Sequence, residues 1–202
     1  VGEIVTLGHL LHEQRLVTHA KELELMAQAA KISVAAQYRA LDLIFPGLTE
    51  ADIEAELHYS YRLQGAKSEA YPSIVATGEN ACTLHYVKNE SVLLEQELVL
   101  IDAGCELQYY ASDVTRTYPV SGRFSSAQRD VYDIVLAANR AAIEACRPGN
   151  HFNLPHEAAT LILVEGLIEL GLLQGDPEQV IAKGEHDKFC PHKTSHWLGL
   201  DV

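Results

Sequence analysis

Positively charged side chains are scarce in this sequence of 202 residues. Only 15 lysines and arginines stand against 28 aspartates and glutamates, which gives a formal net charge of −13. An acidic surface repels phosphate groups, so nucleic-acid binding is not expected. The sequence also lacks any apolar run of about 18 residues, the length that would be needed to span a bilayer. Hydrophobic residues make up 48% of the chain, which is typical of a globular protein.

Several local motifs are missing as well. The first residues, Val1–Ile4, contain no signal peptide, and they lack a methionine, so we expect the sequence to begin inside a longer chain. No G-x-S-x-G motif or phosphate-binding loop occurs. The cysteines form no C-x-x-C pair, and we interpret them as reduced thiols of a cytoplasmic protein rather than zinc ligands. They are Cys82, Cys105, Cys146 and Cys190.

Helical periodicity is clearest in residues 21–65. A first helix is predicted over 21–45, and Pro46–Gly47 ends it. Thr49 then reads as the N-cap of a second helix, with Asp52 completing a weak capping box and Gly65 ending the helix. The apolar stripe predicted for the first helix comprises Leu23, Met26, Ala27, Ala30, Val34, Leu41 and Ile44.

Strand patterns follow these helices. Strands are predicted at Ser73–Thr77, at Leu98–Ile101 and at Val114–Tyr118. The second of them is a continuous apolar run, which predicts a strand buried on both faces. Residues 1–20 show no clean period and are interpreted as a connecting segment, although their histidines leave a metal-binding tract open.

The second part of the chain repeats the helical order. Ser125 and Gln128 form another capping box, Pro148 ends the helix, and Asn153 opens a further helix that ends at Gly171. Two similar units suggest an internal pseudo-twofold axis, although chance similarity explains the pattern as well. The predicted apolar positions of these two helices are Val131, Ile134, Val135, Ala138, Ala142, Ala145, Leu161, Ile162, Leu167 and Ile168.

Two aspartates stand out among residues that could carry chemistry. Asp102 follows the buried strand, and a carboxylate there is costly unless it is paired or bound to a cation. A hairpin closing at Leu107–Gln108 would place Asp102 directly opposite Asp113, where like charges destabilise a sheet. A bound divalent ion, a shared proton and pairing with Arg116 are all compatible with this arrangement, and so is a bulged register that keeps the two apart.

Three histidines are further candidates. His192 and His196 are four residues apart and would share a face of a helix or of a strand. Ser195, Trp197 and Gly199 argue against a helix, and two such histidines are also common as plain polar surface. His85 follows the turn Gly78–Asn80 and could act as an acid or a hydrogen-bond donor, or could be an ordinary loop residue.

Taken together, these residues resemble the aminopeptidase P family of Xaa-Pro aminopeptidases within the pita-bread group of metallopeptidases. The resemblance runs from about Arg15 to Val202. It implies an α+β pita-bread fold, a curved antiparallel sheet with flanking helices whose second half is incomplete. Residues 1–20 would link to a missing amino-terminal domain, 21–120 would form the first half and 121–202 the second. The segments that carry the resemblance are Tyr71–Asn80, Leu84–Tyr86, Leu100–Glu106, Asp113–Thr117 and His192–Val202.

The resemblance also implies roles for individual residues. Asp102, Asp113 and His196 look like three of five ligands to a pair of Mn²⁺ ions. His85 and His192 look like the histidines that contact the substrate. The implied reaction is attack by a hydroxide that bridges the two ions on the bond between an N-terminal residue and a following proline. Peptides with proline at the second position would be the substrates, and a homo-oligomer is left open.

The sequence departs from the family in two places. Lys193 stands where the family usually has a small residue, and such a long cation is tolerated beside a metal if its stem turns outward. The family also continues beyond Val202 into another histidine and two glutamate ligands. We therefore expect this chain by itself to bind Mn²⁺ weakly and to be inactive. The alternatives are a pita-bread binding module that has lost catalysis, and a prolidase that cleaves only dipeptides.

Overall fold

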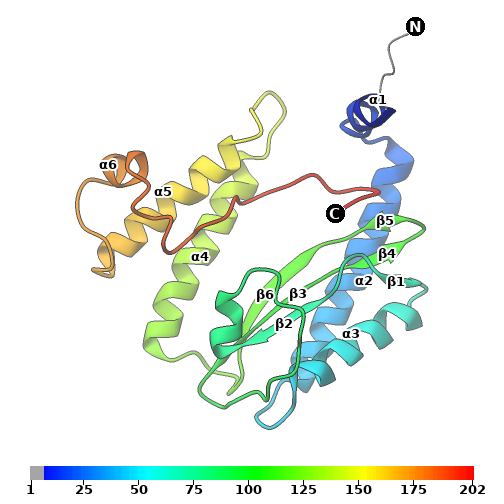
Figure 1. The fold of residues 1–202 in the computed structure, drawn as a ribbon, viewed down its shortest axis with the longest axis horizontal. Coiled ribbons are helices and arrows are strands. Elements are labelled where there is room, and N and C mark those ends of the chain that lie inside the picture. The colour runs from blue at the N-terminus through cyan, green and yellow to red at the C-terminus, as the bar shows by residue number, and fades with distance from the viewer. Residues whose placement is uncertain (1–6) are drawn as a thin grey trace, which may run out of the picture. The chain divides into compact units, whose positions relative to one another are not determined.

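The computed structural model describes residues 7–202 apart from the side chain of His9, and Figure 1 shows its course. The chain forms two compact units. The first contains the described residues up to Arg123 together with Trp197–Val202, and the second contains Phe124–His196. The predicted division into halves at residues 120 and 121 stays a prediction about an internal repeat.

The first unit combines helices with antiparallel strands. Its helices are α1 (Leu7–Arg15), α2 (Ala20–Leu43) and α3 (Glu50–Leu63). The predicted capping box at the start of α3 is confirmed, because the Thr49 side chain accepts from the Asp52 amide and Asp52 accepts from the Thr49 amide. Helix α1 lies in the segment interpreted as a connection. Its leucines are exposed, with Leu7 at 71%, so no apolar stripe faces a core there.

The strands form two connected ladders. Strand β3 (Leu98–Ala103) lies between β2 (Ile74–Thr77) and β6 (Val114–Pro119). After the single residue Gly104 the chain continues into β4 (Cys105–Leu107), which lies between β1 (Ser68–Glu69) and β5 (Tyr110–Ala111). A short 3₁₀ helix, η1 (Gly78–Cys82), follows β2. All pairings are antiparallel.

Helices α2 and α3 cover one face of the sheet (Figure 1). The face of α2 that is buried differs from the predicted stripe, since Leu23, Val34 and Leu41 are exposed. Small residues on the buried face let the helix approach the strands closely, and two polar residues there bond to the sheet. The buried residues of α2 are Ala29, Ile32, Ser33, Ala36, Gln37 and Ala40.

Strand β3 has one buried face rather than the two that its apolar run predicts. Val99, Ile101 and Ala103 are fully buried against the helices, whereas Leu98, Leu100 and Asp102 are only partly buried. This alternation is the normal pattern for an antiparallel sheet with one face against a core. Asp102 therefore lies on the more open face, where a polar group costs less than in the core.

The hairpin that joins β4 to β5 sets a register different from the predicted one. The two-residue turn is Gln108–Tyr109, and both residues have positive φ angles, 51° and 73°. Such turns favour Asn and Gly, so Gln–Tyr gives no sequence signal for one. The turn places Asp102 opposite Thr115 rather than opposite Asp113. Because the register differs by two residues, the two aspartates remain on the same side of the ladder.

Gly104 marks the interruption between the two ladders. A Cβ atom at Gly104 would lie 1.7 Å from the carbonyl oxygen of Ser112, so no other residue fits without moving the backbone. Two polar side chains of α2 form hydrogen bonds with the backbone next to this interruption. The Cys105 amide donates to Ser33 Oγ at 3.0 Å, and Gln37 Nε2 donates to the carbonyl of Val114 at 2.9 Å. Asp113 follows directly after Ser112 at this point.

The second unit is helical. It contains α4 (Ser126–Ala145), α5 (Leu154–Glu169) and the short α6 (Pro177–Ala182). The predicted capping box of Ser125 and Gln128 is confirmed at the start of α4. Of the predicted apolar stripes, only Ala138 and Ala142 belong to the buried core, since small residues mediate the contact of α4 with α5. Phe124–His196, all of which the structure describes, contains no strand.

In the described part of the chain, every helix is too short or too polar to cross a lipid bilayer.

The close approach at Gly104 predicts a large effect of substitution. We expect Gly104→Ala to lower the free energy of unfolding by about 3 kcal/mol, the upper part of the range for overpacking, because the new methyl group meets backbone rather than a movable side chain. Urea denaturation followed by circular dichroism measures this loss. Gly8→Ala in α1 is the matched control, since its Cβ would meet nothing nearer than 4.0 Å. An equal effect of the two substitutions would contradict the prediction.

Candidate metal centre

The two predicted aspartates come together in the first unit. Asp102 is near the end of β3, and Asp113 directly precedes β6. In the β3–β6 register Asp113 falls diagonally across from Asp102, at a distance that long polar side chains can bridge. Gly104 follows Ala103 at the end of β3. Continued by one residue, the register sets Gly104 opposite Asp113, and a glycine adds no side chain there. Both carboxylates are partly buried.

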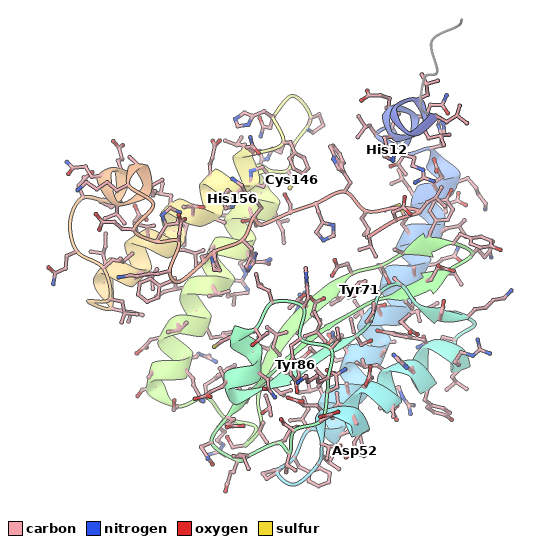
Figure 2. The ribbon with its side chains drawn as sticks, viewed as in Figure 1. His12, Asp52, Tyr71, Tyr86, Cys146 and His156 are labelled. Carbon is pink, nitrogen blue, oxygen red and sulfur yellow. The ribbon has the colours of Figure 1, made fainter. Side chains whose placement is uncertain are left out.

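A third side chain, Tyr71, joins the two carboxylates. Its hydroxyl lies 2.7 Å from Asp102 Oδ1 and 2.9 Å from Asp113 Oδ1. The two oxygens are therefore no farther apart than the sum of these distances. Tyr71 lies between β1 and β2, and Figure 2 labels it beside the strands of the sheet. The Ala70 amide, which donates to the Gly104 carbonyl at 2.8 Å, fixes the backbone next to it.

One phenolic proton serves two carboxylates in this arrangement. A hydroxyl has a single donor, so at any moment only one of the two aspartates receives its full hydrogen bond. The charges of Asp102 and Asp113 repel each other at this separation, and a divalent cation would turn that repulsion into attraction. Carboxylate oxygens are the ligands that hard divalent ions prefer. The donor set of these two residues therefore fits a metal ion.

Arg116 does not pair with Asp102. In the ladder Arg116 lies opposite Ile101, so its side chain leaves the sheet on the other face from Asp102. Its guanidinium donates to the carbonyl of Thr115 at 2.7 Å. The sequence-based alternative in which this arginine pairs the carboxylates is therefore wrong for Asp102, because strand alternation directs the two groups apart.

The environment of Tyr71 keeps its hydroxyl protonated. Burial raises the pKa of Tyr71 far above its usual value, and the negative charge of Asp102 raises it further, followed by that of Asp113. An ionised phenol would bring a third negative charge to the pair. Tyr71 is thus a dedicated hydrogen-bond donor. Sequence reasoning did not assign it a role, because nothing in the segment before Pro72 shows that β1 and β2 bring it to β3.

His85 belongs to the same unit as the aspartates. It lies in the turn after η1, has an exposed side chain and has a positive φ of 55°. The neighbouring Tyr86 is labelled in Figure 2. An exposed imidazole on a defined turn is available to a ligand, which is what the prediction for His85 requires.

His192 and His196 belong to the second unit, in a segment with neither helix nor strand. The expectation that they share a face of a regular element is therefore wrong. His192 Nδ1 lies 2.9 Å from the carbonyl oxygen of Lys193. Thr194 Oγ1 lies 2.7 Å from Nδ1 of His156 on α5, which attaches this segment to the helices. Lys193 is exposed.

The residues that follow His196 return to the first unit. The Ala111 amide on β5 donates to the Gly199 carbonyl at 2.8 Å, and Arg15 forms an ion pair with Asp201. Across residues 7–202, the side chain of His9 excepted, no three His, Cys, Asp or Glu side chains are grouped closely enough to hold a metal ion. The structure thus brings together Asp102 and Asp113, with Tyr71 as an additional member.

The chain thus carries one carboxylate on β3 and a second directly before β6, on an antiparallel sheet flanked by helices. The sequence model of metallopeptidase family M24 matches residues 24–202. The chain belongs to this family.

Individual relatives narrow the comparison to one branch. The Xaa-Pro aminopeptidase of Escherichia coli is 42% identical over 193 residues, which are 96% of this chain and 44% of that protein. The structure of Pseudomonas aeruginosa aminopeptidase PepP superposes with a TM-score of 0.95 at 48% identity, covering 98% of this chain and 45% of that one. A variant of Escherichia coli aminopeptidase P in complex with substrate gives a TM-score of 0.94 at 41% identity, with the same coverage of 98% and 45%.

These matches confirm the pita-bread fold expected from the sequence, an α+β fold with antiparallel strands and flanking helices. They also show that the chain spans less than half the length of the relatives it matches.

The raised pKa of Tyr71 predicts how stability changes at alkaline pH. Because the folded chain holds this proton more tightly than the unfolded chain, the stabilisation is complete below a pH of about 10 and declines as the pH rises above the unfolded value. Tyr71→Phe should make the decline less steep, although Tyr61, another buried phenol with a raised pKa, preserves part of it. Urea denaturation at several pH values between 9 and 11 measures this slope.

Tyr109→Phe is the matched control for this prediction, because the phenol of Tyr109 is 76% exposed. It should leave the alkaline slope as it is in the parent chain. A slope that responds equally to Tyr71→Phe and Tyr109→Phe would contradict the special environment of Tyr71.

Proposed function

We propose that this chain is the metal-binding part of an aminopeptidase that removes an N-terminal residue preceding proline. The observation that carries the proposal is the convergence of Asp102 and Asp113 on the Tyr71 hydroxyl, in a chain of family M24. The names of the relatives support the reaction class, since the relatives from Escherichia coli and Haemophilus influenzae are both named Xaa-Pro aminopeptidase.

In this proposal Asp102, Asp113 and His196 hold a pair of divalent ions, with Mn²⁺ as the expected metal. His196 directly precedes the segment whose Gly199 carbonyl is bonded to Ala111, two residues before Asp113. Hard carboxylate oxygens with an imidazole suit such an ion. When bound, the ions lower the pKa of a water molecule and stabilise the negative charge that develops on the attacked carbonyl oxygen.

The protein's own groups orient the substrate around this centre. His85 and His192 are proposed to donate hydrogen bonds to the scissile carbonyl and to the tetrahedral species that follows, since both have exposed imidazoles. Tyr71 holds the two carboxylates in place through its hydroxyl and does not change protonation. Peptides with proline at the second position are the proposed substrates. A cytoplasmic location and association into a homo-oligomer stay predictions.

Substitution of either aspartate tests the proposal in the full-length protein. Asp102→Asn should lower kcat/KM for an Xaa-Pro tripeptide by at least about 100-fold, since even the outer partners of metal ligands cost about 10–100-fold when lost. Removing divalent ions with a chelator should abolish turnover, and Mn²⁺ should restore it. Asp42→Asn on the exposed side of α2 is the matched control and should change neither turnover nor its dependence on metal.

The substrate panel separates the alternatives. An aminopeptidase cleaves the tripeptide, whereas hydrolysis restricted to Xaa-Pro dipeptides would indicate a prolidase. Binding of the peptide with no cleavage at any Mn²⁺ concentration would indicate a binding module without catalysis. Either of these last two results would overturn the proposed reaction.

A polypeptide of only these 202 residues provides a separate prediction. With Asp102, Asp113 and His196 but not the glutamate ligands that the resemblance assigns to later positions, we expect weak Mn²⁺ binding and no peptide hydrolysis. Isothermal titration calorimetry with Mn²⁺ measures the first, and a release assay with an Xaa-Pro peptide the second. Asp113→Asn should remove the remaining heat of binding. Substantial turnover by the 202-residue polypeptide would show that the assigned ligand set is wrong.

A further inference from the structure

We propose that Glu50, a fully buried carboxylate at the first residue of α3, is a positioning residue that sets the place of His85. The inference rests on the proposed function, because His85 is there assigned to the substrate. The reaction proposed above does not use Glu50 itself. What points to it is the unusually complete set of hydrogen bonds around its side chain.

Each oxygen of the Glu50 carboxylate accepts two hydrogen bonds. Oε1 accepts from the Thr77 amide at 2.7 Å and from Asn80 Nδ2 at 2.9 Å. Oε2 accepts from the Tyr86 hydroxyl at 2.8 Å and from the Ser91 amide at 2.9 Å. The side chain is 0% exposed. A carboxylate has about four acceptor sites, so these donors fill it.

This charge is compensated by donors rather than by a cation. Among the described residues, no lysine, arginine or histidine forms an ion pair with Glu50. A buried carboxylate without partners would be very costly, and hydrogen bonds to a charged acceptor are about twice as strong as neutral ones. The N-terminus of α3 adds a favourable dipole at the same place.

The four donors come from both ends of the segment that carries His85. Thr77 ends β2, and Asn80 lies in η1 just before the turn. Tyr86 follows His85 directly, and Ser91 lies at the far end of the loop. Glu50 also donates its own amide to the Ser91 carbonyl at 2.9 Å. The side chain of Glu50 thus connects the two ends of the loop of residues 83–91.

A second contact secures the loop to the sheet. Asn89 is buried, and its side-chain oxygen accepts from the Val75 amide at 3.0 Å while its nitrogen donates to the Ser73 carbonyl at 2.8 Å. These bonds occupy the free edge of β2. The other edge of β2 pairs with β3, where Ile74 lies opposite Asp102. The loop and the candidate metal ligand are therefore fixed to the same pair of strands.

The backbone at His85 needs this support. Its φ of 55° lies in the left-handed region, which a residue with a side chain adopts at a cost. Such conformations persist where the surroundings determine them fully. The hydrogen bond from the Tyr86 hydroxyl to Glu50 fixes the residue that directly follows His85. Without the Glu50 carboxylate, the turn that carries His85 loses this support, and the imidazole is no longer held in one orientation.

Glu50→Gln is the substitution that tests this role, because it keeps the shape and removes two acceptor sites. The glutamine amide can take two orientations, and its NH₂ group then faces the main-chain N–H of either Thr77 or Ser91. Both groups are donors, so one hydrogen bond is lost in either orientation. We expect kcat/KM of the full-length protein for an Xaa-Pro tripeptide to fall about 100-fold, the scale of a misplaced catalytic group. Mn²⁺ affinity should stay as in the parent.

A double-mutant cycle with His85→Ala separates positioning from a general loss of structure. If Glu50 acts through His85, the double variant Glu50→Gln/His85→Ala is no slower than His85→Ala alone. Losses that multiply would overturn the proposal. Tyr86→Phe is the second variant, which removes one bond and keeps the ring; it should lower kcat/KM in the same direction and show the same lack of additivity. It carries the test if Glu50→Gln does not fold.

Hydrogen exchange gives a readout that does not depend on turnover. In Glu50→Gln the main-chain amides of residues 83–91 should exchange faster, while those of β3 stay unchanged; faster exchange throughout the unit, or none in the loop, would overturn the proposal. Glu79→Gln, an exposed carboxylate of η1, is the matched control and should alter neither exchange nor kcat/KM. A parent protein without peptidase activity would refute the proposed function, and exchange would still decide whether Glu50 holds the loop.

Discussion

The contact between Gly104 and the backbone of Ser112 is the constraint on which the first unit depends. Because no side chain fits at position 104, the two ladders can meet there, and β3 continues into β4 with β5 and β6 following in the same register. The interruption leaves Asp113 outside the regular strand but beside Asp102. The polar face of α2 then bonds the irregular backbone through Ser33 and Gln37. The placement of both carboxylates follows from this one close approach.

The buried face of α2 illustrates why helix periodicity alone did not reveal the packing. Leucine and valine positions predicted the stripe, yet those side chains are exposed, and the buried positions are three alanines, Ile32 and two polar residues. Alanine allows a close approach, and a buried Ser or Gln is stable only because it meets a specific backbone group. Such complementarity depends on the sheet, so it cannot be seen in the helix sequence.

The local signals that involve few residues were predictable. Capping boxes at Thr49 and Ser125 and the strand patterns are confirmed, because their causes lie within a few residues. The register was not, since Gln108–Tyr109 adopts a turn that usually requires Asn or Gly. Asp102 and Asp113 still share one side of the ladder, because the error in the register was two residues and side chains alternate with period two. Tyr71 and Glu50 were missed, as these partners lie 27 to 42 positions away in the sequence.

Comparison of Glu50 with the aspartate pair shows two opposite treatments of negative charge in one unit. Glu50 is surrounded by four donors, two of them main-chain amides that cannot move independently, so its acceptor sites are filled and its place is fixed. Asp102 and Asp113 instead lie close together, because both carboxylates are within hydrogen-bonding distance of the one hydroxyl of Tyr71. A carboxylate whose acceptor sites are filled suits a structural anchor, and two carboxylates held close together suit a cation. The proximity of the two aspartates makes them the candidates to bind metal, and the four donors make Glu50 the proposed anchor of the loop.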